Sequence, residues 1–260
     1  MQATTLALVG ATGGAGTTRT AVELAALGAR DGREVAVIDA AFTTQGLSEY
    51  VSGRIGTDLT ALLTDETDAA LSAAAFPIRT DGNGAETASD LPGRADAVPA
   101  RAPFERAARA KTAEAARKLE RRIDEAATAY DAVIVDAAPV GSNEAVAAVT
   151  AADRVEAVTP ATAHGRDALQ RLRGRIADVG GSVDGTITVA RAGGSGAESE
   201  AEVRADTRLP AVDAAVGSAP EAAVGTGAYV EALAEAYERA FDASLGIEFA
   251  EPGLVERIRS

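Results

Sequence analysis

The chain has 260 residues, 47% of them hydrophobic, which is enough to bury a substantial core without disulfide staples. It contains no cysteine, so disulfides, iron–sulfur ligation and thiolate catalysis are excluded. Its 39 acidic and 25 basic residues give a formal net charge of −14, which opposes docking on bare nucleic acid or on an anionic membrane.

The kind of charge is also informative. Lysine occurs only at positions 111 and 118, and arginine supplies the other cations. Acidic, lysine-poor, alanine-rich composition is typical of salt-adapted archaea, although a GC-rich genome produces the same bias and stays an open alternative. No stretch has the ~18 uncharged apolar residues of a membrane span, and the first residues do not follow signal-peptide order. We therefore expect a cytoplasmic protein.

Short apolar runs alternate with stretches of helical periodicity along the chain. The runs are residues 5–9, 34–38, 132–135, 154–158 and 186–189, with a weaker one near 209–216. They lack polar alternation, which is typical of strands buried on both faces. This order predicts a doubly wound α/β fold, a mostly parallel sheet with helices on both faces.

Apolar residues at helical spacing predict helices around 169–179 and 230–241, and one long helix from Phe104 to Ile123. Residues 80–103 are rich in Gly, Pro, Asp and Ala, and we interpret them as a surface insertion with little order of its own. We expect a single domain over residues 1–245, followed by a C-terminal tail over residues 246–260.

A glycine-rich turn follows the first apolar run, where residues 10 to 20 read GATGGAGTTRT. Glycines at such a strand-to-helix turn let a phosphate approach the backbone, and dinucleotide-binding folds use a similar pattern. Asp39 lies 23 residues beyond Gly16, where a ribose-binding acid would belong. However, no tyrosine is followed by lysine four residues later, which argues against a short-chain dehydrogenase.

A second motif lies at residues 130–139, YDAVIVDAAP, an apolar strand that ends in Asp136. This is the form of a Walker B strand, whose carboxylate holds the water shell of Mg²⁺. The alternative is an ordinary buried strand in which Asp136 caps the next turn.

Together these segments resemble the MinD/ParA family of P-loop ATPases over nearly the whole chain. The family's deviant Walker A motif, K-G-G-x-G-K-T-T, aligns without gaps with the stretch Thr12-Gly13-Gly14-Ala15-Gly16-Thr17-Thr18-Arg19. Its D-x-D motif aligns with Asp39-Ala40-Ala41, its Y-D-x-[IV]-[IV]-[IV]-D-x-x-P strand with residues 130–139, and its A-D-x-V segment with residues 152–155. The resemblance implies a P-loop NTPase fold.

The departures from the family pattern fall on charged groups. Thr12 stands at the signature lysine, Thr17 at the Walker lysine and Ala41 at the second acid of D-x-D. The resemblance assigns nucleotide binding to Thr12, Gly13, Gly14, Ala15, Gly16, Thr17, Thr18 and Asp39, and the metal to Thr18 and Asp136. No catalytic residue is assigned. Arg19 lies about 200° around the helix from position 17, so we expect it to point away from the phosphates.

We therefore expect a degenerate family member of haloarchaeal type: a regulatory or scaffolding pseudo-ATPase in cell division, partitioning or positioning. ATP with Mg²⁺ would bind weakly if at all. The expected partners are a second copy, a competent paralogue or another protein, and neither direct nucleic-acid binding nor membrane attachment is expected. Two alternatives stay open, a Mg·ATP-binding switch with weak hydrolysis and a non-catalytic NAD(P)-binding Rossmann protein.

Overall fold

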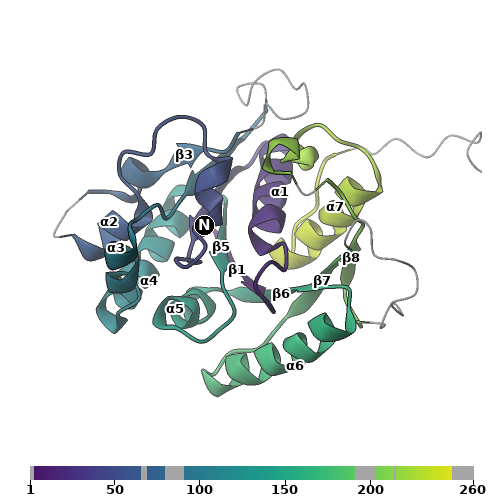
Figure 1. The fold of residues 1–260 in the computed structure, drawn as a ribbon. Helices are drawn as coiled ribbons and strands as arrows, with labels where there is room; N and C mark the ends of the chain where they lie inside the picture. The colour runs from purple at the N-terminus through teal and green to yellow at the C-terminus, as the bar shows by residue number, and fades with distance from the viewer. Residues whose placement is uncertain (1–2, 66–68, 80–90, 191–202, 214, 248–260) are drawn as a thin grey trace, which may run out of the picture.

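The structure, a computed structural model, describes residues 3–65, 69–79, 91–190, 203–213 and 215–247 (Figure 1). Within these residues the strands form one eight-stranded sheet in the order β3-β4-β2-β5-β1-β6-β7-β8. Their bounds are β1 Thr4–Gly10, β2 Glu34–Asp39, β3 Phe76–Pro77, β4 Arg94–Val98, β5 Ala132–Ala137, β6 Arg154–Pro160, β7 Gly185–Val189 and β8 Thr207–Leu209. Every pairing is parallel except that of β3 with β4.

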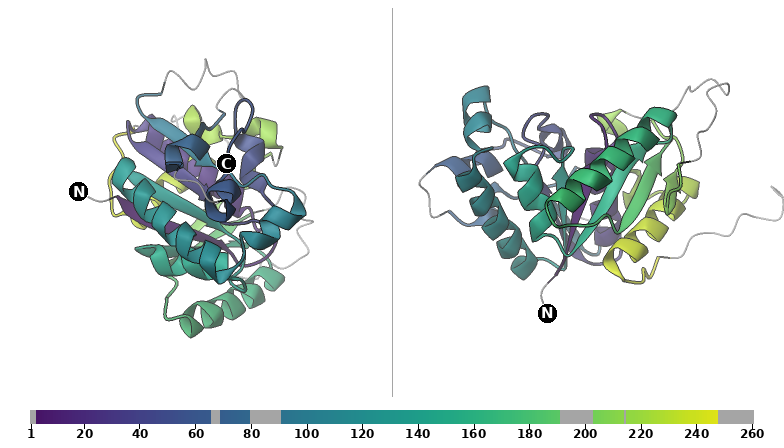
Figure 2. Two further views of the ribbon diagram at one scale, coloured as in Figure 1. Left: turned by 90° about the vertical axis from the view of Figure 1, so that its left-hand side faces the viewer. Right: turned by 90° about the horizontal axis from the view of Figure 1, so that it is seen from below.

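Helices cover both faces of this sheet, as Figure 1 and the two views of Figure 2 show. One face carries α1 (Thr17–Arg30), α7 (Ala228–Phe241) and the short turns η1 (Gly46–Tyr50), η5 (Val216–Ser218) and η6 (Glu221–Ala223). The other face carries α2 (Leu59–Thr64), α4 (Ala113–Ala129), α5 (Asn143–Ala151) and α6 (Ala163–Asp178). The short elements η2 (Leu71–Ala74) and α3 (Phe104–Arg109) lie in the connections.

The central strand β1 shows why the chain forms this layered core. Leu6 and Leu8 are fully buried under α1 and α7, whereas Ala7 and Val9 are fully buried on the opposite face. Side chains alternate across a strand, so an uninterrupted apolar run serves both layers at once. The predicted doubly wound α/β fold is confirmed.

The strand order bears on the dinucleotide alternative. In the Rossmann fold the first two strands are neighbours, whereas here β5 lies between β1 and β2. The Rossmann alternative is therefore wrong for this fold. No helix within the described ranges combines the length and apolar character that a bilayer-crossing segment needs.

The structure corrects two of the predicted elements. Residues 80–103 are not an insertion of little order throughout, because residues 94–98 form β4 between β2 and β3. This strand contains Ala, Asp and Arg with a single β-branched residue, so its propensity is weak, and pairing with β2 decides its conformation. Residues 80–90 and the tail beyond 247 lie outside the described residues.

The long helix predicted from Phe104 to Ile123 is divided in two. α3 ends at Arg109, and α4 begins after Thr112, whose hydroxyl accepts a hydrogen bond from the N–H of Ala115 at 3.3 Å. Threonine competes with the helix backbone for hydrogen bonds and favours such a cap position. Helical spacing runs through this break, so periodicity alone does not locate it.

Candidate functional site

The turn between β1 and α1 follows a path that requires glycine. Gly14 and Gly16 have φ angles of 68° and 91°, in the left-handed region that side-chain-bearing residues rarely adopt. Gly16 precedes α1, and no side chain caps the first N–H groups of that helix. Free N–H groups and the helix dipole attract an anion at such an N-terminus. The turn therefore keeps the backbone of an anion cradle.

The threonines of the turn pack against its surroundings. The Thr17 hydroxyl oxygen lies 2.7 Å from the position that a Cβ on Gly10 would occupy, so this side chain folds over the base of the turn. Thr18 lies against Gly46 at the start of η1, with Oγ1 3.6 Å from the corresponding position. At neither position does the side chain bring a positive charge to the cradle.

Two carboxylates lie together where β2 and β5 end. Asp39 and Asp136 face each other in the strand register, and both are buried. Asp39 accepts hydrogen bonds from the N–H groups of Ala41 at 2.9 Å and Ala100 at 3.3 Å. Neither carboxylate oxygen of Asp136 has a hydrogen-bond partner of good geometry.

Burial dominates the electrostatics of this pair. It raises the pKa of Asp39, and the neighbouring Asp136 raises that pKa further. Burial also raises the pKa of Asp136. The Thr18 hydroxyl lowers this pKa, although its contact with the Asp136 carboxylate lacks the geometry of a good hydrogen bond. A buried carboxylate without a partner is costly, and a cation would remove that cost. Asp136 is therefore a buried polar group at this edge that a bound cation would stabilise.

A magnesium ion fits the residues present. Mg²⁺ retains several waters and needs only one or two protein oxygens in addition to phosphate oxygens. The Thr18 hydroxyl and the unpartnered Asp136 carboxylate would supply these oxygens, and bound Mg²⁺ would neutralise phosphate charge. In the described part of the chain, no group of three or more His, Asp or Glu side chains forms a closed metal site.

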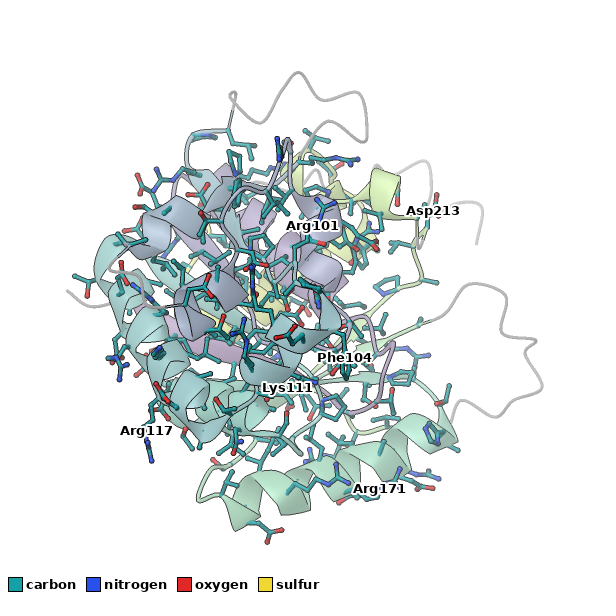
Figure 3. The ribbon with its side chains drawn as sticks, turned by 60° about the vertical axis from the view of Figure 1, so that its left-hand side comes forward. Arg101, Phe104, Lys111, Arg117, Arg171 and Asp213 are labelled. Atoms are coloured by element: carbon teal, nitrogen blue, oxygen red, sulfur yellow. The ribbon has the colours of Figure 1, made fainter. Side chains whose placement is uncertain are left out.

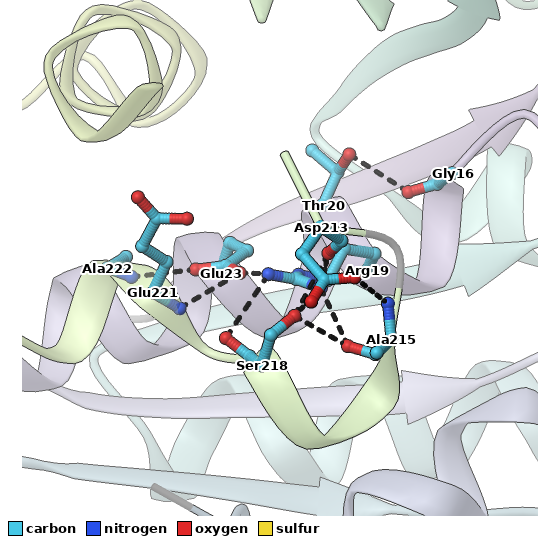
Figure 4. Close-up of polar contacts among 9 residues, drawn as sticks. All are labelled: Gly16, Arg19, Thr20, Glu23, Asp213, Ala215, Ser218, Glu221 and Ala222. Atoms are coloured by element: carbon cyan, nitrogen blue, oxygen red, sulfur yellow. Dashed lines mark hydrogen bonds and ion pairs between the residues drawn. The ribbon is translucent and has the colours of Figure 1, made fainter. Parts of the chain in front are cut away.

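Arg19, the cation nearest in sequence to the turn, is engaged elsewhere (Figure 4). Its Nε lies 2.5 Å from a carboxylate oxygen of the fully buried Glu23, and its guanidinium also donates to the carbonyl oxygen of Asp213 at 3.1 Å. Glu23 in turn accepts hydrogen bonds from the N–H groups of Glu221 and Ala222 at 3.0 and 2.8 Å. These contacts hold Arg19 on the C-terminal segment, as expected of a side chain that points away from the turn.

The structure thus gathers the predicted residues at one edge of the sheet. The turn over residues 12–18 follows β1. On the β5 side of this turn, Asp39 is the last residue of β2 and Asp136 the last but one of β5. Ligands of open α/β sheets bind at this edge, beyond the carboxyl ends of the strands. That these residues bind a nucleotide stays a prediction.

Sequence reasoning missed the polar residues that support this edge. Gln45 exchanges two hydrogen bonds with the backbone of Ala102, at 3.1 and 2.7 Å, and Lys111 Nζ lies 2.5 Å from Thr43 Oγ1. These pairs join segments far apart in the chain and leave no local signal. Glu23 was detectable, because it follows Arg19 at the i,i+4 spacing of a helical ion pair.

Comparison with known proteins agrees with this arrangement. The family model described as "AAA domain" matches residues 3–188, and no curated protein matches the chain. Among solved structures, MinD from Pyrococcus horikoshii with Mg-ADP is 20% identical, with a TM-score of 0.62 over 80% of this chain and 81% of that one. An ATP complex of a Cyanothece McdA variant is 18% identical, with a TM-score of 0.68 over 95% and 99%.

A third structure, MinD in complex with MinC from Aquifex aeolicus, is 16% identical, with a TM-score of 0.66 over 95% and 99%. At these identities the likeness establishes the fold, while the family model covers well over half of the chain. The family model shows that this chain belongs to the AAA domain family, and its strands and helices have the fold of the MinD and McdA structures.

Proposed function

We propose that the protein is a MinD/ParA-type P-loop protein that turns over ATP negligibly and works as a regulatory or scaffolding partner in cell division, partitioning or positioning. The observation that carries this proposal is the loss of charge from an intact cradle. Thr12, Thr17 and Ala41 stand where the group's motifs have two lysines and an acid. Meanwhile Gly14 and Gly16 keep the left-handed backbone of the turn.

The loss of the lysines is expected to affect nucleotide binding and ATP hydrolysis to different extents. One charge-assisted hydrogen bond to phosphate is worth about 1.5–3 kcal/mol, so losing the Walker lysine weakens binding roughly ten- to a hundredfold. A cation that stabilises the transition state contributes on the order of 10³–10⁵ in rate. Arg19 does not replace either lysine, because it is held by Glu23 and by the carbonyl oxygens of Asp213 and Ser218. Hydrolysis is therefore affected more than binding.

A Mg·ATP-binding switch with weak hydrolysis is the second candidate, and the unpartnered Asp136 favours it. Relatives of the same fold have been crystallised with Mg-ADP and with ATP. In this chain Thr18 and Asp136 would hold the magnesium side of such a ligand, and the backbone of the turn would hold the phosphates.

A protein partner is the third part of the proposal. A MinD of the same fold has been solved in complex with MinC, so this architecture supports protein docking. Pairing with a second copy or with a competent paralogue needs surface complementarity rather than the lost lysines. The protein would then act by recruiting or restraining that partner.

Phosphate release and thermal unfolding, measured on one purified sample in molar KCl, test the proposal. We expect no ATPase activity above that of a sample heat-inactivated before assay. Saturating Mg·ATP at a hundred times its dissociation constant would stabilise the fold by about 2.7 kcal/mol. A rise in melting temperature without hydrolysis supports the switch, and no rise supports the scaffold. Brisk hydrolysis that Asp136→Ala abolishes would overturn both.

A further inference from the structure

The first residue of α3 is an exposed aromatic side chain, Phe104. Phe104 is 89% exposed, and among the described residues only Val224 is another large apolar side chain that is exposed. Single exposed apolar residues are common, so exposure by itself means little. The surroundings of Phe104 give it significance.

A hollow of about 530 Å³ lies beside this ring. Its walls come from α3, through Phe104 and the small residues Ala107 and Ala108, and from the loop after β2, through Phe42. Lys111 also lines the hollow, and Figure 3 shows Lys111 close to Phe104, with Arg101 above them in that view. The alanines leave room for a bulky apolar side chain next to Phe104.

The charge around this hollow is opposite to that of the whole chain. Residues 101–111, RAPFERAARAK, carry four cations and one acid, whereas the chain has a net charge of −14. Arg101 and Arg109 are exposed and form no ion pair with a described carboxylate. Arg106 Nη1 lies 3.9 Å from Asp58 Oδ1, and Lys111 Nζ lies 3.9 Å from Glu144 Oε1, so these two are partly neutralised.

We propose that this surface, formed by residues 101–111 and the loop at 42–45, docks a segment of a partner protein that carries carboxylates beside a bulky apolar side chain. The apolar side chain would occupy the hollow against Phe104, and the carboxylates would pair with Arg101 and Arg109. Apolar anchors in a pocket provide most of the affinity of such interfaces, and charge complementarity sets specificity.

The docking surface is connected to the candidate nucleotide site by hydrogen bonds. Asp39 accepts from the N–H of Ala100, and Gln45 is bonded to Ala102 in both directions. The segment that leads into Phe104 is thus attached at two points to the end of β2 and its loop. A partner seated here contacts the same loop that follows Asp39.

This inference rests on the proposed function, because it names the surface through which a recruiting protein would act. Nucleic acid is the rival occupant of a cationic surface, and its phosphates need no apolar hollow. A net charge of −14 also opposes it. An acidic partner with an apolar anchor uses both features of the surface.

A selection from a random 12-residue peptide library displayed on phage tests the proposal. The bait is the full chain, at the lowest KCl concentration at which circular dichroism shows it folded. We expect enrichment of peptides that combine Asp or Glu with Phe, Leu, Ile, Met or Trp. The best peptide, labelled with fluorescein, is then titrated against variants by fluorescence polarisation.

Phe104→Ala and the double variant Arg101→Glu/Arg109→Glu should each weaken this peptide at least about tenfold. The control variants are Arg117→Glu and Arg171→Glu, which change exposed arginines on α4 and α6, and they should bind within about twofold of the wild type. Peptides without acid enrichment, an unchanged affinity in Phe104→Ala, or equal losses in the controls would overturn the proposal.

A labelled 30-base-pair duplex DNA, titrated against the same variants, serves as the competing probe. DNA binding that Arg101→Glu/Arg109→Glu abolishes and Phe104→Ala leaves unchanged would overturn the proposal in favour of nucleic acid. ATPase activity is measured on each sample. Brisk hydrolysis with intact peptide docking would refute the proposed function alone, whereas absent hydrolysis without docking would refute only this inference.

Discussion

Helix α1 borders two regions that differ in whether their buried carboxylates have hydrogen-bond partners. In the contact of its first turns with residues 215–222, buried Glu23 has three partners, namely Arg19 and the N–H groups of Glu221 and Ala222. At the glycine turn just before the same helix, buried Asp136 has no partner of good geometry. A buried polar group whose hydrogen bonds are satisfied stabilises the fold, whereas one without a hydrogen-bond partner indicates a site for a ligand.

The comparison also shows where the chain kept its cations. Arg19 is retained as a structural clamp between α1 and the C-terminal segment, while positions 12 and 17 of the turn are threonine. The fold therefore does not depend on the positive charges that the turn lacks. Substitutions that break the clamp, restore charge to the turn or alter the carboxylate pair test this difference.

Among the polar contacts, the largest effect on stability is expected from breaking the clamp. Glu23→Ala leaves the Arg19 guanidinium and two N–H groups without their partner and should lower the free energy of unfolding by about 3 kcal/mol. Urea unfolding followed by circular dichroism measures this change. The matched control is Glu114→Ala, because Glu114 is 80% exposed and forms an i,i+4 pair with Lys118 at 3.8 Å. Its loss should stay below about 0.5 kcal/mol, and equal losses would show that the clamp has no special role.

Restoring one lysine should have the largest effect on binding. Thr17→Lys places a cation where the family's Walker lysine lies, and it should tighten ATP binding roughly ten- to a hundredfold, or about 1.5–3 kcal/mol. Isothermal titration calorimetry with Mg·ATP measures the dissociation constant. Thr17→Met is the control, because it has similar length and no charge. If Thr17→Met tightens ATP binding as much as Thr17→Lys does, the missing positive charge does not explain weak binding.

The carboxylate pair should make stability depend on pH. A carboxyl whose pKa is raised by folding costs nothing below its ordinary pKa of about 4; its cost in stability grows as pH rises from there to the raised pKa and is constant above it. Asp136→Asn removes that cost and the repulsion on Asp39, so it should stabilise the magnesium-free protein by about 1–2 kcal/mol at pH 8 and by less at pH 5, where only part of the cost has developed.

Melting temperatures at the two pH values, without and with Mg·ATP, measure this effect. Any rise that Mg·ATP produces in the wild type should be absent from Asp136→Asn. Asp178→Asn, on an exposed position of α6, is the control and should show neither effect. A gain in stability at pH 5 as large as that at pH 8 would contradict the account of Asp136.

The smallest effect is expected for Phe104→Ala. Its ring is exposed, so the free energy of unfolding should change by less than about 0.5 kcal/mol. Phe42→Ala, on the other side of the same hollow, removes a ring that is 1% exposed and should cost about 3–5 kcal/mol. Urea unfolding of both variants measures the difference. Similar losses would mean that Phe104 supports the fold rather than a partner.

Some features of this protein follow from the sequence because they are local. The run Ala132–Val135 predicts a buried strand, since an apolar run without alternation suits a strand covered on both faces. The spacing of glycines 10, 13 and 16, which begins with the last residue of β1, predicts a strand-to-helix turn. Gly16 adopts the left-handed backbone that makes glycine necessary there. Both predictions depend only on neighbouring residues.

Other features were decided by segments distant in the chain. β4 forms because β2 supplies its hydrogen-bonding partner, which outweighs the weak strand propensity of Arg94–Val98. The register of β2 with β5 places Asp39 opposite Asp136, and the burial that raises their pKa values exists only in the assembled core. Arg19 is held by residues nearly 200 positions away. Local pattern determined which segments become strands and turns, and only tertiary packing decided which polar groups find partners, because a partner far along the chain leaves no periodic trace.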